Sequence, residues 1–329
     1  MSKNISFMGV LLSLVLFLFI GLYFGQKSIL PLGPDAYASC SVSMDQVLDS
    51  GKGDVYNFTG VTNFEEPAFY YLASYDVEEN TITDPILKTV PKDLQDEQQD
   101  TVLQQEAWSI FTTLIPVQNR QMVSQFNVFT DGYSNTLAAV DQTENDLSQW
   151  MLEVDVADLE DKDALIYTMV HEYAHLLTLN SSQVTPDADT YKDPLNPELQ
   201  KEKAAACSTY FVGTGCTHPD SYMNAFYNRF WADISDEWQQ VDALQYGAED
   251  LVPYYNGLYA FYLKHKDRFV DDYAVTHPAE DIAESFTYFV FNPKPVGNSI
   301  RDQKLAFFYE YPELVQLRED ILSGACSMK

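Results

Sequence analysis

The stretch at residues 167–180 reads YTMVHEYAHLLTLN and holds the side chains best suited to chemistry. His171 and His175 are four positions apart, and Glu172 directly follows the first of them. On a helix, two imidazoles at this spacing project from one face and can both reach a Zn²⁺ ion at about 2.0–2.1 Å. Glu172 is turned too far round to be a good ligand, but it can accept a proton from an attacking water. Because Zn²⁺ lowers the pKa of water to about 7, the motif predicts metal-assisted hydrolysis at neutral pH.

The helix expected at 164–179 has two different sides. Large apolar residues share one side, which must pack into a core: Leu165, Ile166, Met169, Val170, Tyr173, Leu176 and Leu177. Small or polar residues share the other side: Ala164, Thr168, His171, Ala174, His175 and Thr178. Acids at 161 and 163 suit the positive end of a helix. We therefore predict a core helix that offers its histidines to a metal; the alternative is two unrelated surface histidines.

A metal site of this kind needs a third ligand. An additional histidine from the same stretch would need glycine at 178 and histidine at 181, but Thr178 and Ser181 stand there. The remaining common solution is a carboxylate on another helix, and residues 273–286 are the best candidate. Glu280 and Glu284 share one face there, after Pro278 in a first helical turn. A buried pair of carboxylates is costly unless a metal or imidazoles compensate it.

Other interpretations of the same residues stay open. His277 is the second candidate for the third ligand, although it can instead cap the helix that follows it. Glu280 and Glu284 can also be read as a solvated helix face. His218 and His265 have no partner in the sequence and are expected at the surface.

Tyr273 and the two glutamates also carry a resemblance. With H-E-x-x-H followed by Tyr-x6-Glu-x3-Glu, the chain resembles the anthrax-lethal-factor-like zinc metallopeptidases, gluzincins that include the Pro-Pro endopeptidases. The resemblance implies that Glu280 is the third zinc ligand and that Glu284 accepts a hydrogen bond from a ligand histidine. It also implies that Tyr273 donates to the oxyanion of the tetrahedral intermediate. The interval before Glu280 is longer than in that family and holds the Cys207–Cys216 loop.

Size and charge limit the kinds of partner. The chain has 329 residues, 46% of them apolar, which is ample for a core. With 49 acidic against 19 basic residues, its formal net charge is −30. Such a chain repels phosphate backbones, so nucleic acid is not an expected partner. Its acidity suits solubility in an extracellular medium.

An apolar segment at residues 7–24 contains Ser13 as its only polar side chain and just reaches the length that spans a membrane. The one small-x-small site, at 36–38, lies well downstream. We therefore favour a retained signal-anchor at 1–27 over a cleaved signal peptide. Either way the remaining chain is expected outside the cell, held at the membrane or secreted.

Four cysteines fit export: Cys40, Cys207, Cys216 and Cys326. None forms a C-x-x-C pair, so a cysteine-ligated zinc has no support. Cys207 and Cys216 bracket a turn-rich loop suited to a local disulfide, which leaves Cys40 and Cys326 to pair near the two ends. The alternative is four buried thiols.

The chain reads as an α+β, zincin-like, two-lobed fold. After the anchor we expect a stalk at 28–60, a lobe with a small mixed sheet and the motif helix at 61–195, and a mainly helical lobe at 196–329. Strand-like runs fall at 66–75, 121–130, 135–141 and 149–156, and further helices at 92–115, 197–206, 219–246, 250–270, 278–291 and 299–322. The run at 149–156 is expected to be the edge strand on which an extended substrate pairs. Asp187, Asp189 and Asp193 lie in a predicted solvated loop at 181–197, because the glycine of a calcium-binding EF-hand loop is missing.

These expectations combine into a zinc metalloendopeptidase with one Zn²⁺ per chain, a peptide or protein substrate and Glu172 as general base. Attack by water predicts no acyl-enzyme. One rival is a catalytically inactive zincin-fold surface binding protein, against which the intact Glu172 argues. The other is an amidase acting on cell-wall peptides, which the sequence does not separate from a protease.

Overall fold

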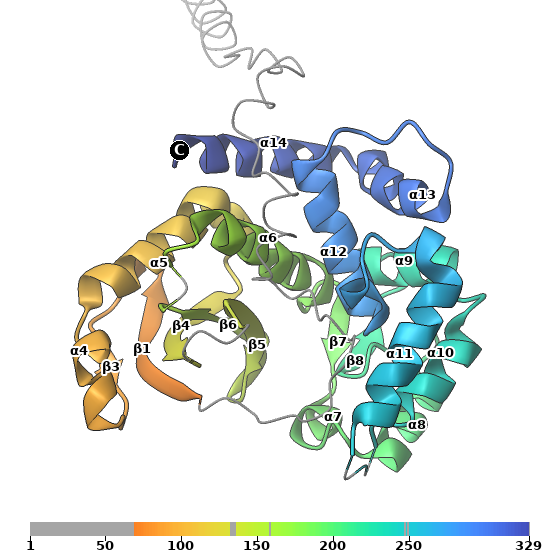
Figure 1. Ribbon diagram of the computed structural model, residues 1–329, viewed down its shortest axis with the longest axis horizontal. Coiled ribbons are helices and arrows are strands. Elements are labelled where there is room, and N and C mark those ends of the chain that lie inside the picture. The colour runs from red at the N-terminus through yellow and green to blue at the C-terminus, as the bar shows by residue number, and fades with distance from the viewer. Residues whose placement is uncertain (1–68, 132–135, 158, 247, 249, 329) are drawn as a thin grey trace, which may run out of the picture. The chain divides into compact units, whose positions relative to one another are not determined.

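The computed structural model describes residues 69–131, 136–157, 159–246, 248 and 250–328. They form an α+β fold with a six-stranded sheet, a two-stranded sheet and mostly helical structure after the motif helix, as predicted (Figure 1). The expected anchor and stalk lie outside the described residues. No helix within the described ranges is long and apolar enough to cross a membrane. The lobe boundary at 195/196 stays a prediction.

The larger sheet is mixed and has the order β2-β1-β4-β6-β5, with β3 also paired to β1. Its strands are β1 (Tyr70–Glu78), β2 (Thr81–Ile82), β3 (Ile86–Leu87), β4 (Val123–Thr130), β5 (Ala138–Thr143) and β6 (Asp146–Asp155). β4 and β6 pair in parallel, and the other pairs are antiparallel. Phe126, Leu152 and Val154 are fully buried and belong to the core on one face of this sheet.

The expectation that residues 149–156 form the edge strand is wrong. They lie in β6, which pairs with β4 on one side and with β5 on the other. The physical reason is burial: Trp150 and every residue from Leu152 to Val156 is buried, as suits an internal strand. β5 precedes β6 in a tight hairpin, carries the exposed Asp141 and takes the edge of the sheet.

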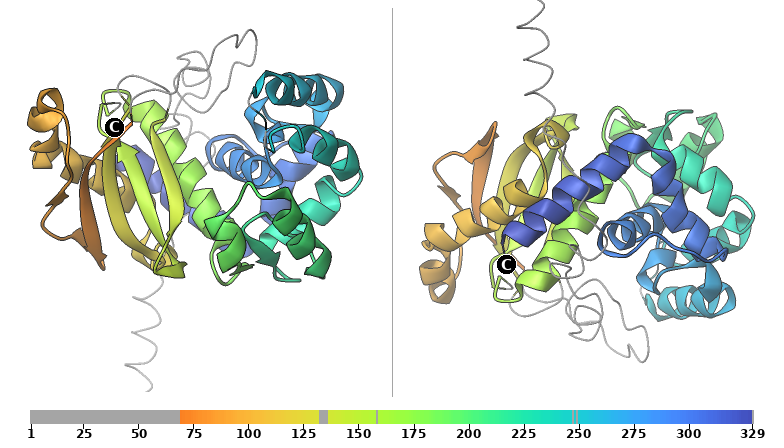
Figure 2. Two further views of the ribbon diagram at one scale, coloured as in Figure 1. Left: turned by 90° about the horizontal axis from the view of Figure 1, so that it is seen from below. Right: turned by 90° about the horizontal axis from the view of Figure 1, so that it is seen from above.

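The motif lies in α6 (Lys162–Leu179), close to the predicted bounds. Asp161 caps it, because its side chain accepts a hydrogen bond from the backbone N–H of Ala164 at 3.1 Å. α6 runs between the sheet and α12 (Pro278–Phe291), as Figure 2 shows. Residues 164–176 are therefore all buried. The side that carries the histidines is covered by a second helix rather than left open.

The other helices differ from prediction mainly in their breaks. They are α4 (Gln95–Gln98), α5 (Thr101–Leu114), α7 (Ala188–Lys192), α8 (Pro197–Ala206), α9 (Tyr222–Phe230), α10 (Ser235–Asp242), α11 (Val252–His265), α13 (Ile300–Phe307) and α14 (Pro312–Ser327). The single helices expected at 92–115, 219–246 and 299–322 are each divided in two. The last break falls before Pro312, whose ring cannot continue a helix from the preceding turn.

α14 packs against α5, far away in the sequence (Figure 1). The two helices approach so closely that a Cβ atom on Gly324 would lie 2.2 Å from the carbonyl oxygen of Thr113. Only a residue without a side chain fits this position. Gly324 therefore sets the contact between α5, which lies between β3 and β4 in the chain, and the last helix described.

The loop expected at 181–197 is partly regular. It holds β7 (Val184–Pro186), which pairs with β8 (Gly215–Thr217), and the short helix α7. Asp187 caps α7, and the Lys203 ammonium lies 2.7 Å from carboxylate oxygens of both Asp187 and Asp189. These two aspartates therefore have a structural partner, which the sequence interpretation missed.

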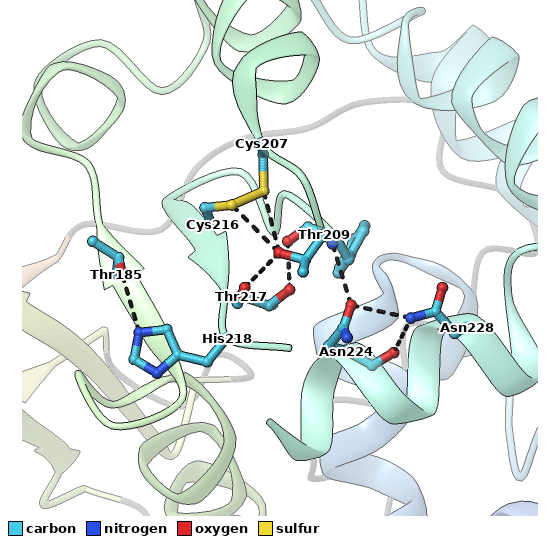
Figure 3. Close-up of a disulfide and its surroundings, with 9 residues drawn as sticks. Thr185, Cys207, Thr209, Cys216, Thr217, His218, Asn224 and Asn228 are labelled. Atoms are coloured by element: carbon cyan, nitrogen blue, oxygen red, sulfur yellow. Dashed lines mark hydrogen bonds between the residues drawn. A yellow bond between two sulfur atoms is a disulfide. The ribbon is translucent and has the colours of Figure 1, made fainter. Parts of the chain in front are cut away.

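The predicted Cys207–Cys216 disulfide is present and joins the end of α8 to β8, with Cα atoms 5.6 Å apart (Figure 3). The Thr209 hydroxyl oxygen lies 3.5 and 3.4 Å from the two sulfur atoms and donates to the carbonyl oxygen of Thr217. Cys40 lies outside the described residues, so its pairing with Cys326 stays a prediction.

Candidate metal centre

α6 and α12 bring the three predicted ligands together. The Nε2 atoms of His171 and His175 are 3.1 Å apart. Oε2 of Glu280 lies 3.1 Å from the first and 3.2 Å from the second. Tetrahedral zinc with ligands at about 2.0–2.1 Å spaces their atoms about 3.3–3.4 Å apart, so this triangle has nearly the right size. The group can hold a metal ion.

The electrostatics of the triangle also suit a cation. Burial lowers the pKa of His171, but the carboxylates of Glu284 and Glu280 outweigh it and raise that pKa well above its usual value. Burial raises the pKa of Glu280, but the imidazoles of His175 and His171 outweigh it and hold that pKa well below its usual value. The three candidate ligand atoms thus surround one position in a region where carboxylates favour positive charge. A divalent cation satisfies all three together, so the donor set fits the predicted zinc.

Glu284 stands behind the triangle, as the resemblance implied. Its Oε1 lies 2.9 Å from Nδ1 of His171, and its other oxygen accepts a hydrogen bond from the Tyr167 hydroxyl. Asp271 also hydrogen-bonds to Glu284, and burial together with the charge of Glu284 raises the Asp271 pKa well above its usual value. A carboxylate beside Nδ1 favours the tautomer of His171 that has its proton on Nδ1. The lone pair on Nε2 then faces the position between the three candidate ligands.

Sequence reasoning missed Tyr167 and Asp271. Tyr167 was visible as the one large side chain next to an otherwise small and polar helix side, one turn before His171. Asp271 had no such signal, because its proximity to Glu284 depends on the turn η4 (Tyr273–Val275) that leads into α12.

Glu172 and Tyr273 face the same cavity as the three ligands. The cavity has a volume of about 360 Å³ and is lined by α6, β5, the start of α12 and Thr214. Glu172 is 6% exposed. The Tyr273 ring centre lies 5.9 Å from that of His171. Both residues predicted to act on a substrate thus lie beside the ligands.

The remaining histidines have other roles. Nδ1 of His277 accepts a hydrogen bond from the Ala279 backbone at 3.1 Å, so His277 caps α12 and is not part of the ligand group. Burial lowers its pKa to about 4. His218 binds the Thr185 hydroxyl at 3.0 Å (Figure 3), and His265 lies 3.1 Å from Glu237.

Comparison with protein-family models, curated proteins and solved structures finds no significant match for this chain.

Proposed function

We propose that this chain is a zinc-dependent peptidase with a zincin-like fold and a gluzincin ligand set of His171, His175 and Glu280. The observation that carries the proposal is the triangle of ligand atoms at 3.1–3.2 Å, with Glu172 on the wall of the same cavity. When bound, Zn²⁺ polarises a carbonyl group and lowers the pKa of water toward neutrality.

The chain's own residues have distinct tasks in this proposal. Glu172 accepts a proton from the attacking water and passes it to the leaving amine. The Tyr273 hydroxyl donates to the carbonyl oxygen as negative charge develops on it. Glu284 takes the Nδ1–H of His171 and is itself held by Tyr167, so that the lone pair on Nε2 stays directed at the ligand triangle.

The substrate is expected to lie along β5. This edge strand lines the cavity that contains the ligand triangle and Glu172. An extended peptide can add to such an edge through backbone hydrogen bonds. A substrate bound this way brings one of its peptide bonds past Glu172 without any large change in the protein.

The location of the protein belongs to the same proposal. We place the catalytic residues outside the cell, either held by the apolar segment at 7–24 or secreted. The Cys207–Cys216 disulfide supports this, because disulfides persist mainly in oxidising compartments.

The test is zinc content measured beside hydrolysis. The purified full-length chain is expected to hold about one zinc, by analogy with catalytic sites that have three protein ligands, and to cleave members of a peptide library followed by mass spectrometry. Glu172→Gln is expected to keep the zinc and to lose hydrolysis by about 10²–10⁴-fold. A chain that binds zinc and peptides but cleaves none of them is a binding protein. Full activity of Glu172→Gln refutes the proposed base.

A further inference from the structure

The hydrogen bonding of β5 determines how much of its edge a peptide can use. The backbone N–H of Asp155 in β6 donates to the carbonyl oxygen of Leu137 at 2.9 Å. In an antiparallel pair, residues that bond to the partner alternate with residues whose N–H and C=O point away from it. Given the register of β5 and β6, the groups that point away from β6 belong to Ala138, Val140 and Gln142.

The backbone groups of Gln142 are already occupied. Its carbonyl oxygen accepts a hydrogen bond from the Tyr191 hydroxyl at 3.0 Å. Its N–H donates to the side-chain carboxylate of Asp141 at 2.7 Å. Across the described ranges, no residue bonds to the outward groups of Ala138 and Val140. The open part of the edge therefore ends at Gln142 and matches roughly three residues of an extended peptide.

Tyr191 lies outside the residues that line the cavity, and its segment is tied to the cavity wall through Thr214. It lies on α7, which Asp187 caps. The backbone N–H of Asp187 donates at 2.9 Å to the carbonyl oxygen of Thr214, which lines the cavity. Lys203 adds its ion pairs at 2.7 Å. The segment that carries Thr214 is closed by the Cys207–Cys216 disulfide (Figure 3).

Resting on the peptidase function proposed above, we propose that Tyr191 is a specificity-determining residue that stops the substrate strand at Gln142. The cleft then binds a peptide that ends within a few residues of the scissile bond on the side of Gln142. It does not bind an internal segment of a long chain. The substrate class is short peptides and the exposed ends of proteins. The competing explanation is that Tyr191 only covers a sheet edge against unwanted pairing, which needs no substrate.

The experiment uses a ladder of peptides with one cleavable bond, extended one residue at a time at either end. Dissociation constants are measured with zinc-loaded, full-length Glu172→Gln, and kcat/KM with the wild-type chain. We expect extension at one end to have little effect. At the other end, extension beyond roughly three residues is expected to weaken binding and lower kcat/KM by about tenfold or more.

Tyr191→Ala removes the ring and is expected to restore binding of the long peptides while leaving the short ones unchanged. Tyr191→Phe keeps the ring and removes only the hydrogen bond, so we expect a partial restoration and a folded protein. Tyr309→Phe is the matched control, because it removes a hydroxyl from the segment between α13 and α14, where no hydrogen bond of the described residues joins it to β5. It should reproduce the wild-type length dependence.

The outcomes separate the two proposals. The role of Tyr191 is overturned if, with Tyr191 present, binding does not depend on peptide length at either end. It is also overturned if both Tyr191 variants leave the length dependence unchanged. Binding with the expected length dependence but no hydrolysis of any peptide overturns the peptidase and supports the strand stop. Failure to bind any peptide overturns both.

Discussion

Two buried charge clusters lie on the same helix and differ in their balance. Asp281 of α12 is fully buried and lies 2.5 Å from the ammonium of Lys304 on α13. It also accepts a hydrogen bond from the Trp231 indole at 2.7 Å, and the ammonium sits 4.0 Å from the Phe269 ring centre. One cation thus faces one carboxylate, and aromatic rings enclose the pair.

The ligand cluster lacks that balance. Glu280 and Glu284 point from α12 toward two imidazoles, and Glu172 adds a third carboxylate nearby. Within the described ranges, no lysine or arginine lines the cavity that Glu172 and Glu280 share. Buried charges persist only when they are compensated, so the balanced cluster is complete as it stands, whereas the excess of carboxylates beside the two imidazoles suits a cation at this site. The comparison explains why neighbouring acids on one helix have different roles.

The largest expected effect comes from removing one of the three ligands. Glu280→Ala should nearly abolish zinc binding, and activity should return, if at all, only with excess metal. Elemental analysis and peptide hydrolysis measure this together, with Glu198→Ala on exposed α8 as the control. Normal zinc content in Glu280→Ala, with zinc lost from His277→Ala instead, would assign the third ligand to His277.

Breaking the balanced cluster should affect stability alone. Lys304→Met leaves Asp281 buried without its cation and is expected to lower the free energy of unfolding by about 3–5 kcal/mol. Zinc per folded chain should not change. Denaturant unfolding checks the first point and elemental analysis the second. The double variant Lys304→Met with Asp281→Leu is expected to regain much of the stability, because no unpaired charge remains. Loss of zinc at full stability would contradict the separation of the two clusters.

Tyr273→Phe should reduce kcat by about 10²–10³-fold, because it deletes one hydrogen bond that forms mainly in the transition state. KM and zinc content should stay near their wild-type values. Steady-state kinetics beside metal analysis distinguish this from a ligand defect. A variant that loses zinc in proportion to activity would show that Tyr273 supports the metal rather than the reaction.

Glu284→Ala is expected to have a smaller effect than the three changes above. It removes the acceptor at Nδ1 of His171 but no ligand atom, so zinc affinity should fall about 10–100-fold. Competition with a chelator of known affinity measures the change. Tyr167→Phe is the matched comparison and should weaken zinc less, since it removes only a bond to Glu284. Unchanged affinity in both variants would show that the network behind His171 has no influence on the metal.

The grouping of His171, His175 and Glu280 was predictable because its signal is local. The spacing of His171 to His175 and of Glu280 to Glu284 fixes which side chains share a helix face, wherever the two helices end up. The sequence also indicated the local disulfide, and it allowed a helix cap at Thr276 or His277, of which the structure has His277. These inferences need only neighbouring residues and standard helix geometry.

Other features depend on contacts that no short stretch contains. Lys304 has the sequence pattern of an ordinary surface lysine on an amphipathic helix, and it is buried by long-range contacts of α13 with α12 and with aromatic rings such as Phe269. The place of β5 at the edge depends on β6 pairing with β4 across a long interval. Tyr191 could not be linked to Gln142 for the same reason. Hydrophobic periodicity predicts where a strand lies in the chain, but it does not predict which strands pair with one another.

The contact between Gly324 and Thr113 joins an early and a late part of the chain, so it can form only late in synthesis. α6 emerges from the ribosome long before α12, so a growing chain carries the H-E-x-x-H motif without Glu280. α14 follows later still, and its contact with Thr113 on α5 forms only then. A chain interrupted between α6 and α12 has two histidines and a base but no complete ligand set. Synthesis itself thus delays the ligand set until most of the fold that encloses it has been made.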